Sequence, residues 1–240
     1  MPQRGLADLH MHTDHSDGWP KPAELVRFAR DHTALDVIAI TDHDTIEGAL
    51  RGAEYAARLR SGPYVIIGEE VSSREGHIVG LFLNSRVAPG LSASSTLERI
   101  HRQGGLAFAA HPFWRRERPS RRSSVHGIGW LAVDLPFDGI EVENSTPGFY
   151  LFNQMAHRLN EMMGCAELGN SDAHILDAMG RAYTTFPGRT SADLRLALEG
   201  RKTIAHRERY RAMGIVRYMA WGLNHQRMET VVAAAEGRSR

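Results

Sequence analysis

The sequence lacks the features that place a protein outside the cytoplasm. Its 240 residues include one cysteine, Cys165, so no disulfide can form within the chain and a reducing compartment is favoured. Cys165 follows an apolar Met-Met-Gly segment, and we expect it to pack in the core rather than act as a nucleophile. No apolar run approaches the roughly 18 residues of a membrane span, and no signal-like segment is present. We therefore expect a cytoplasmic protein with no membrane partner.

The sequence also lacks an excess of either charge. Lys and Arg number 29 against 28 Asp and Glu, which gives a net charge of +1. A balanced chain offers no global electrostatic attraction for nucleic acid or membranes. Neither a Gly-x-Ser-x-Gly elbow, a P-loop nor a Gly-x-Gly-x-x-Gly fingerprint occurs. What the chain does contain is histidine, 13 residues of it, and their positions matter more than their number.

Short apolar runs alternate with segments of helical period along the chain. The runs predict strands at Gly5–His10, Asp36–Thr41, Tyr64–Val71, His77–Leu83, Leu106–Ala110, Gly139–Glu143, Ala166–Asn170 and Ala182–Phe186. Helices are predicted at Pro22–His32, Thr45–Leu59, Thr96–Gln103, Phe149–Met163 and Ser191–Leu198. This alternation favours a parallel sheet with helices outside, closed into an α/β barrel.

We expect residues 1–240 to form a single domain, with the barrel at 5–205 and a helical tail at 206–240. In the tail, Val216, Met219 and Leu223 recur with helical spacing. Such a stripe indicates packing on the barrel exterior or a contact between subunits.

Histidines and carboxylates stand at or near the ends of the predicted strands, with His77 at the start of one. They are His10, His12, Glu70, His77, His111, Asp172 and His174. Functional residues of α/β barrels lie at the carboxyl ends of the strands. His10 and His12 are two residues apart, so a strand would point both side chains to one face. Imidazoles mixed with carboxylates suit Zn, Mn or Fe rather than Mg or Ca alone.

These segments resemble, in order, the motifs of the PHP family, which is named for its polymerase and histidinol-phosphatase members. The matching segments are Asp-Leu-His-Met-His-Thr at 8–13, Ser-Asp-Gly at 16–18, Thr-Asp-His-Asp at 41–44, Gly-Glu-Glu-Val-Ser at 68–72, Gly-His-Ile at 76–78, Ala-His-Pro at 110–112, Gly-Ile-Glu-Val at 139–142 with Asn144, and Ser-Asp-Ala-His at 171–174. The resemblance covers about residues 5–205 and implies a distorted (β/α)7 TIM-like barrel.

The resemblance also implies two or three divalent metal ions, Mn, Fe or Zn. By position, the first would be held by His10, His12, Glu70 and Asp172. Glu70 would bridge to a second, held by His77 and His111. Asp17, His43 and His174 would hold the third.

Our hypothesis is hydrolysis of a small phosphate monoester by a metal-bridging hydroxide. Glu70, Asp172, His174 and His43 would be the catalytic residues. Asp42 or Glu141 either orients a ligand histidine or makes local hydrogen bonds. For the phosphate, the candidates are Arg115, Arg116 and Arg181.

Three rival functions stay open. The basic loop 115–122, with Trp114 beside it, would suit a phosphodiesterase or exonuclease acting on nucleotides or single-stranded nucleic acid. The interval from His77 to His111 lacks the long insertion of family members that act on nucleotides, which disfavours that substrate. The second rival is a metal-loaded module without turnover, and the third is a metal-dependent amidohydrolase.

Overall fold

The computed structural model describes residues 3–114, 127–210 and 212–224. Its strands are β1 (Arg4–Asp8), β2 (Val37–Ile40), β3 (Tyr64–Ser72), β4 (His77–Leu81), β5 (Leu106–Ala109), β6 (Gly139–Asn144), β7 (Ala166–Asn170), β8 (Ala182–Pro187) and β9 (Ile204–Arg207). Its helices are α1 (Pro22–His32), α2 (Glu47–Ala57), α3 (Ala93–Arg102), α4 (Tyr150–Met163) and α5 (Ser191–Glu199), with short 3-10 turns η1 (Gly129–Asp134) and η2 (Leu176–Ala178). A further helix spans 212–224.

The strands pair into one curved sheet in the order β7-β6-β5-β4-β3-β2-β1-β8-β9. Parallel pairing joins β1 to β2, β2 to β3, β5 to β6 and β6 to β7. β4 runs antiparallel to both of its neighbours, and β8 and β9 are also antiparallel. The turn between β3 and β4 is too short for the crossover that a parallel pair requires, so the chain reverses there.

The sheet curls until β7 lies against β8 and β9. No strand ladder joins β7 to β8 among the described residues, but the Thr184 hydroxyl accepts from the Gly169 N–H and donates to its carbonyl, both at 3.0 Å. A Cβ on Gly169 would stand 2.6 Å from the Tyr183 carbonyl oxygen. Glycine is therefore required for the two backbones to approach, and the result is a nearly closed barrel.

Helix α5 closes the end of the barrel where the parallel strands begin. Its Leu194 and Leu198 share a buried cluster with Val37, Leu106 and Ala166, the first residues of β2, β5 and β7. That end is filled by apolar side chains. The opposite end, where the parallel strands finish, is left for polar residues.

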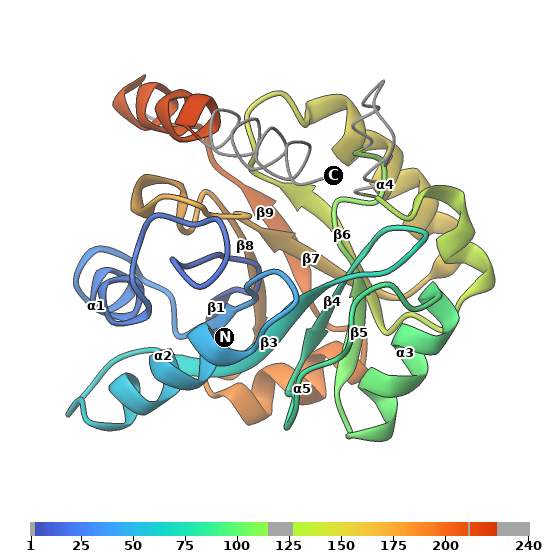
Figure 1. The fold of residues 1–240 in the computed structure, drawn as a ribbon, viewed down its shortest axis with the longest axis horizontal. Helices are drawn as coiled ribbons and strands as arrows, with labels where there is room; N and C mark the ends of the chain where they lie inside the picture. The colour runs from blue at the N-terminus through green and yellow to red at the C-terminus, as the bar shows by residue number, and fades with distance from the viewer. Residues whose placement is uncertain (1–2, 115–126, 211, 225–240) are drawn as a thin grey trace, which may run out of the picture.

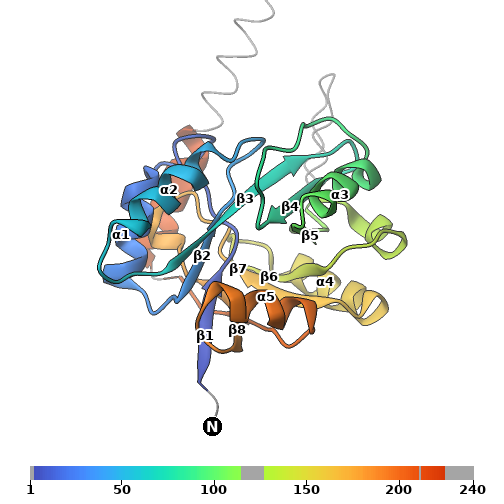
Figure 2. The same ribbon diagram turned by 90° about the horizontal axis from the view of Figure 1, so that it is seen from below.

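The other helices cover the outside of the sheet. Figures 1 and 2 show α1 and α2 on one side and α3 and α4 on the other. Leu25 of α1 packs with Ile40 of β2, and Ile100 and Leu159 of α3 and α4 pack with Ile140 of β6. Within the described residues, no helix has the length and apolar character needed to span a bilayer.

The predicted α/β barrel is confirmed, and all eight predicted strands and five predicted helices have counterparts. Three features differ. The sheet is mixed rather than parallel, and the described part of the chain contributes nine strands to it rather than the seven that the resemblance implied. The strand that the sequence did not reveal, β9 (Ile204–Arg207), is short and half exposed, so its hydrophobic pattern is weak. Because residue 207 ends this strand, the tail does not become helical there.

Leu198 and Leu196 provide a matched test of the α5 plug. Leu198 is 1% exposed and Leu196 is 69% exposed. We expect Leu198→Ala to lower the free energy of unfolding by about 2–5 kcal/mol, because it removes buried contacts and leaves a cavity. Leu196→Ala should change it by about 0.5 kcal/mol or less. Denaturant unfolding followed by circular dichroism measures both, and equal losses would show that α5 does not seal the barrel.

Cys165 lies in the core, as expected. Its side chain donates to Asn160 Oδ1 at 3.3 Å, and burial raises the pKa of the thiol to about 11. Since the thiolate is the reactive form, we expect a disulfide reagent at pH 8 to label the folded protein far more slowly than the protein in denaturant. Labelling at equal rates would contradict this assignment.

Candidate metal centre at the barrel mouth

Glu70, near the end of β3, is the centre of the polar barrel mouth. Its side chain is 1% exposed. Five imidazole nitrogens lie within 3.3 Å of its two carboxylate oxygens, and they belong to His10, His12, His43, His77 and His111. The shortest of these distances, 2.7 Å, joins Oε1 to Nδ1 of His77. A buried carboxylate that faces imidazoles with both oxygens is suited to bridging two cations.

A second group of ligand atoms lies beside the first. Asp172 Oδ1 is 3.2 Å from His12 Nε2 and 3.6 Å from His10 Nε2. Asp17 Oδ2 lies 3.3 Å from His174 Nε2 and 3.8 Å from His43 Nε2. We call these nine residues the His/acid cluster: His10, His12, Asp17, His43, Glu70, His77, His111, Asp172 and His174.

Every metal-ligand candidate from the sequence thus lies in the cluster. Ligand atoms within 4.8 Å of one another form four groups: His12, Asp17, His43 and His174; His10, His12 and Glu70; His10, His111 and Asp172; His43, Glu70 and His77. The groups share members: His10, His12, His43 and Glu70 each belong to two of them, so each stands between two possible cation positions. The implied third set, Asp17, His43 and His174, falls within one group.

His12 shows that the cluster fits cations. Both of its ring nitrogens are buried and make no hydrogen bond with any described residue, and the same holds for Nδ1 of His111. Yet carboxylate oxygens lie 3.2 and 3.3 Å from His12 Nε2, out of hydrogen-bond alignment. A buried polar atom without a partner costs about 1–3 kcal/mol. Coordination of a shared ion would satisfy the imidazole and the carboxylates together.

Glu141 orients His10 by binding the ring nitrogen that does not face Glu70. His10 Nδ1 lies 3.1 Å from its Oε1, which leaves Nε2 directed at Glu70 and Asp172. The same carboxylate accepts three more hydrogen bonds, from the His111 backbone N–H and the side-chain amides of Asn144 and Asn170. A carboxylate behind a ligand imidazole fixes its tautomer and raises its basicity.

Asp42 makes local hydrogen bonds, the second of the two roles that the sequence left open for Asp42 and Glu141. Its carboxylate accepts from the Thr13 N–H and hydroxyl and from the Ser16 hydroxyl, at 2.6–2.8 Å. It therefore holds the loop that carries Asp17. A Cβ on Gly18 in this loop would stand 2.3 Å from the His12 carbonyl oxygen, which explains why the Ser-Asp-Gly segment ends in glycine.

Two cluster residues have strained backbones. The φ angles of Asp172 and His111 are +53° and +25°, in a region that residues other than glycine occupy only when their surroundings enforce it. Asp8, at the end of β1, helps to hold the loop of Asp172 by accepting the N–H groups of Ser171 and Gly180. Burial raises the pKa of the Asp8 carboxyl to about 6.

Opposite charges set the electrostatics of the cluster. Burial alone would raise the pKa of Glu70, but the surrounding histidines, His43 foremost, hold it well below its usual value. Asp172 behaves likewise beside His10. Burial lowers the pKa of His77. Burial opposes protonation of His174 as well, but Asp17 and Asp172 together raise its pKa to about 9. Ionised carboxylates among imidazoles are the donor set that a divalent cation requires.

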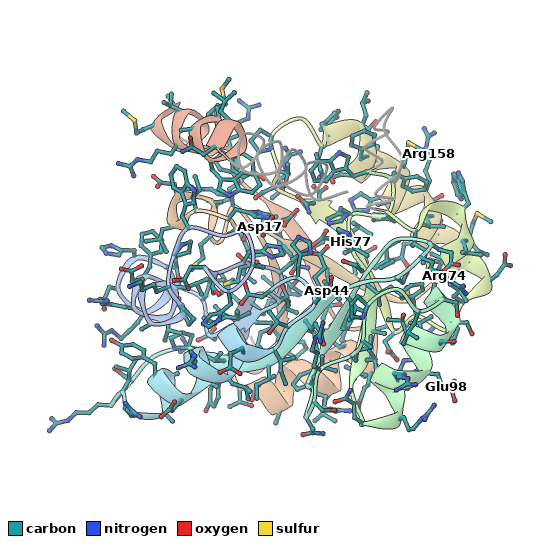
Figure 3. The ribbon with its side chains drawn as sticks, viewed as in Figure 1. Asp17, Asp44, Arg74, His77, Glu98 and Arg158 are labelled. Atoms are coloured by element: carbon teal, nitrogen blue, oxygen red, sulfur yellow. The ribbon has the colours of Figure 1, made fainter. Side chains whose placement is uncertain are left out.

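One side of the cluster opens to solvent. The side chain of His43 is 28% exposed and that of Asp17 is 17% exposed, whereas His10 and His12 are at 0%. Figure 3 shows Asp17 and His77 near the centre of the barrel, away from Arg74 and Glu98 at its edge. Substrate would therefore approach over His43 and Asp17.

Of the three arginines proposed to bind phosphate, only Arg181 lies in the described part of the chain. Arg115 and Arg116 lie outside the described residues. Arg181 pairs with Glu208 at 3.6 Å and donates to the Asp177 carbonyl. It lines a pocket of about 410 Å³ with residues of α1 and η2; none of these residues belongs to the cluster.

Two aromatic residues of the tail contact the cluster and its loops, and neither was among the residues predicted from the sequence. Trp221 packs on His174 with ring centres 4.1 Å apart, and the Tyr218 hydroxyl lies 3.3 Å from Thr146 Oγ1. The expected stripe, Val216, Met219 and Leu223, is about 60% exposed. Both faces of this helix are apolar, so periodicity alone does not distinguish them. Aromatic residues with a polar atom, spaced three apart, were the available signal.

A cluster of imidazoles and carboxylates at the mouth of an α/β barrel is the arrangement of a metal-dependent hydrolase. Comparison with known proteins makes the class specific. The PHP domain model matches residues 8–125, and the PHP-associated model matches residues 151–203. An uncharacterized protein of Methanocaldococcus jannaschii is 36% identical over 150 residues, covering 58% of this chain and 81% of that protein. The chain belongs to the PHP family.

Two further relatives have a named activity. A 5'-3' exoribonuclease of Haemophilus influenzae is 29% identical over 231 residues, covering 90% of this chain and 76% of that protein. A 3',5'-nucleoside bisphosphate phosphatase of Chromobacterium violaceum is 39% identical over 113 residues, covering 43% of this chain and 38% of that protein. Both names describe phosphoesterases.

The fold agrees with a solved structure. A two-domain protein of Bacteroides vulgatus, described as containing a predicted PHP-like metal-dependent phosphoesterase, superposes with a TM-score of 0.68 at 24% identity. The match covers 86% of this chain and 66% of that one. At this identity the likeness establishes the fold.

Glu141 and its neighbour Glu143 allow a test of the orienting carboxylate. A glutamine at 141 would set an NH2 group against donors that now bind a carboxylate, so His10 would lose its alignment. We expect Glu141→Gln to weaken metal binding about 10–100-fold. Glu143 accepts from Asn153 and His157 instead, so Glu143→Gln should bind metal normally. Elemental analysis after dialysis measures both; equal metal contents would remove the role of Glu141.

Proposed function

We propose that this PHP-family phosphoesterase hydrolyses a small phosphate monoester, using two or three divalent ions of Mn, Fe or Zn. The observation that carries the proposal is the surrounding of the Glu70 carboxylate by five imidazoles, next to a second acidic group built on Asp172 and Asp17. Phosphoryl transfer depends on charge neutralisation and in-line positioning more than on covalent help.

Each ligand has an assigned place in this proposal. The first ion is assigned to His10, His12, Glu70 and Asp172, the second to Glu70, His77 and His111, and the third to Asp17, His43 and His174. When bound, such ions lower the pKa of a coordinated water from 15.7 toward about 7 and neutralise phosphate charge. Glu70 and Asp172 would supply the negative charge that holds such ions, and Glu141 keeps His10 Nε2 directed at Glu70 and Asp172.

His43 and His174 are assigned to the substrate side. His174 Nδ1 lies 2.9 Å from the Asp172 carbonyl oxygen, which fixes the ring and leaves Nε2 to face Asp17. His43 is the more exposed of the two, so we assign it, when it does not hold the third ion, to the leaving-group oxygen. Arg115 and Arg116 follow His111 closely in sequence and are assigned to the phosphate. Arg181, paired with Glu208, is the weakest of the three candidates.

Hydrolysis of nucleotides or single-stranded nucleic acid is the second candidate. It is favoured by the similarity to a 5'-3' exoribonuclease across 90% of this chain and by the match to a nucleoside bisphosphate phosphatase. Both relatives weigh against the inference drawn from the short His77–His111 interval. A diester substrate would contact several phosphates, whereas a monoester presents one.

The function is tested with His12→Ala and Asp172→Ala against His157→Ala, a histidine that pairs with Glu143 outside the cluster. We expect both cluster variants to lose metal and to lower kcat/KM by at least about 10³-fold, because several kcal/mol of transition-state stabilisation are removed. His157→Ala should keep both properties. The panel contains a phosphomonoester, a nucleoside 3',5'-bisphosphate, single-stranded RNA and an amide. Metal-loaded protein that cleaves no member of the panel would overturn the proposal.

Salt dependence separates the two candidates. A monoesterase should show nearly constant KM between low and moderate salt. Binding of a single strand would weaken steeply: the logarithm of the association constant would fall against the logarithm of the salt concentration with a slope of about −0.7 for each phosphate contact. Measurement of KM or Kd at increasing KCl distinguishes them.

A further inference from the structure

The helix at 212–224 lies beyond both matched family regions, which end at residues 125 and 203. It nevertheless contacts the loops that carry the cluster. Arg217 binds both carboxylate oxygens of Asp177 at 2.9–3.0 Å, just after the strand-end loop of His174. Tyr218 reaches Thr146, whose hydroxyl is 3.4 Å from Asp172 Oδ2. Figure 1 shows the helix, in red, at the side of the barrel.

Trp221 makes the closest of these contacts. Its indole N–H donates to the Asp17 carbonyl at 2.7 Å. Its ring lies 4.1 Å from the ring of His174, tilted by 40°. The opposite side of the His174 ring stacks on His12, with centres 4.2 Å apart and planes at 20°. One side chain therefore fixes the backbone of Asp17 and one face of His174.

We propose that Trp221 is a positioning residue that aligns Asp17 and His174 for a divalent cation. The inference rests on the proposed assignment of these two residues to the third ion. Asp17 lies on a loop rather than on a strand, and its carboxylate must face His174 Nε2, now 3.3 Å away. The hydrogen bond to the Asp17 carbonyl and the packing on His174 both come from the rigid indole of Trp221. One side chain therefore fixes the position of these two residues relative to each other. Ligands held by outer contacts bind metal more tightly.

The helix is built to present Trp221 in this way. Tyr218 and Trp221 are three residues apart, hence neighbours on one helix face, and their rings meet at 5.3 Å. Arg217, four residues before Trp221 and on the same face of the helix, binds Asp177 of η2. Leu223 is 62% exposed on the other side, which makes it a control in the same helix.

The experiment is Mn²⁺ titration of chelator-treated full-length protein, followed by the electron paramagnetic resonance signal of free Mn²⁺ and without substrate. We expect Trp221→Ala to weaken one Mn²⁺ site by about tenfold or more while the other sites keep their affinity. Trp221→Phe keeps the ring packing and loses the N–H donor, so an intermediate loss is expected. Trp130 of η1 is 52% exposed and outside the His/acid cluster, so Trp130→Phe is a control for the loss of an indole. Leu223→Ala and Trp130→Phe should match the wild type.

Wild-type affinities in both Trp221 variants would overturn the inference, and so would an equal loss at every site. If Trp221→Ala fails to fold by circular dichroism, Trp221→Phe decides alone. Asp17→Asn separates this inference from the metal assignment. If Asp17→Asn leaves Mn²⁺ binding unchanged, the third-ion assignment fails and the role of Trp221 fails with it. If Asp17→Asn weakens binding and the Trp221 variants do not, only the role of Trp221 is overturned.

Discussion

The structure depends on one buried carboxylate and the imidazoles around it. Burying a charge costs several kcal/mol unless partners compensate it, and Glu70 meets that condition with histidines from four separate segments of the chain. β3, which carries Glu70, lies in the middle of the strand order. Strands on both sides can therefore direct side chains at the same point. The barrel supplies the convergence, and Glu70 supplies the charge that the imidazoles surround.

The two ends of the barrel divide stability from chemistry. At one end, α5 and the first residues of the parallel strands form an apolar plug. At the other, buried histidines with unpartnered nitrogens and the positive φ angles of two cluster residues, His111 and Asp172, store free energy that works against folding. The plug and the outer helices offset this cost. Strain of this kind is tolerated at functional sites because the surrounding structure determines the backbone there.

The sequence predicted the cluster better than the architecture around it. His10 and His12 could be predicted to act together because the two-residue period of an extended chain puts both side chains on one face. Glu70, His111 and Asp172 follow apolar runs that are unmistakable as strands. The sequence carries no signal that β8 runs antiparallel to β1 and β9, since strand direction depends on pairing with strands that can be far away in sequence. In the tail, both helix faces are apolar, and only tertiary contacts decide that Tyr218 and Trp221 turn inward.

The reversal of β4 has a consequence for how this protein can change over evolutionary time. His77 opens β4 and pairs with Ser72 across a turn of fixed length, and side chains alternate between faces with a period of two. Insertion or deletion of one residue in that turn would rotate His77 away from Glu70. Helical crossovers elsewhere in the barrel can lengthen without moving a ligand. Related sequences should therefore vary in length at the helical crossovers, whereas the turn between β3 and β4 should keep a constant length.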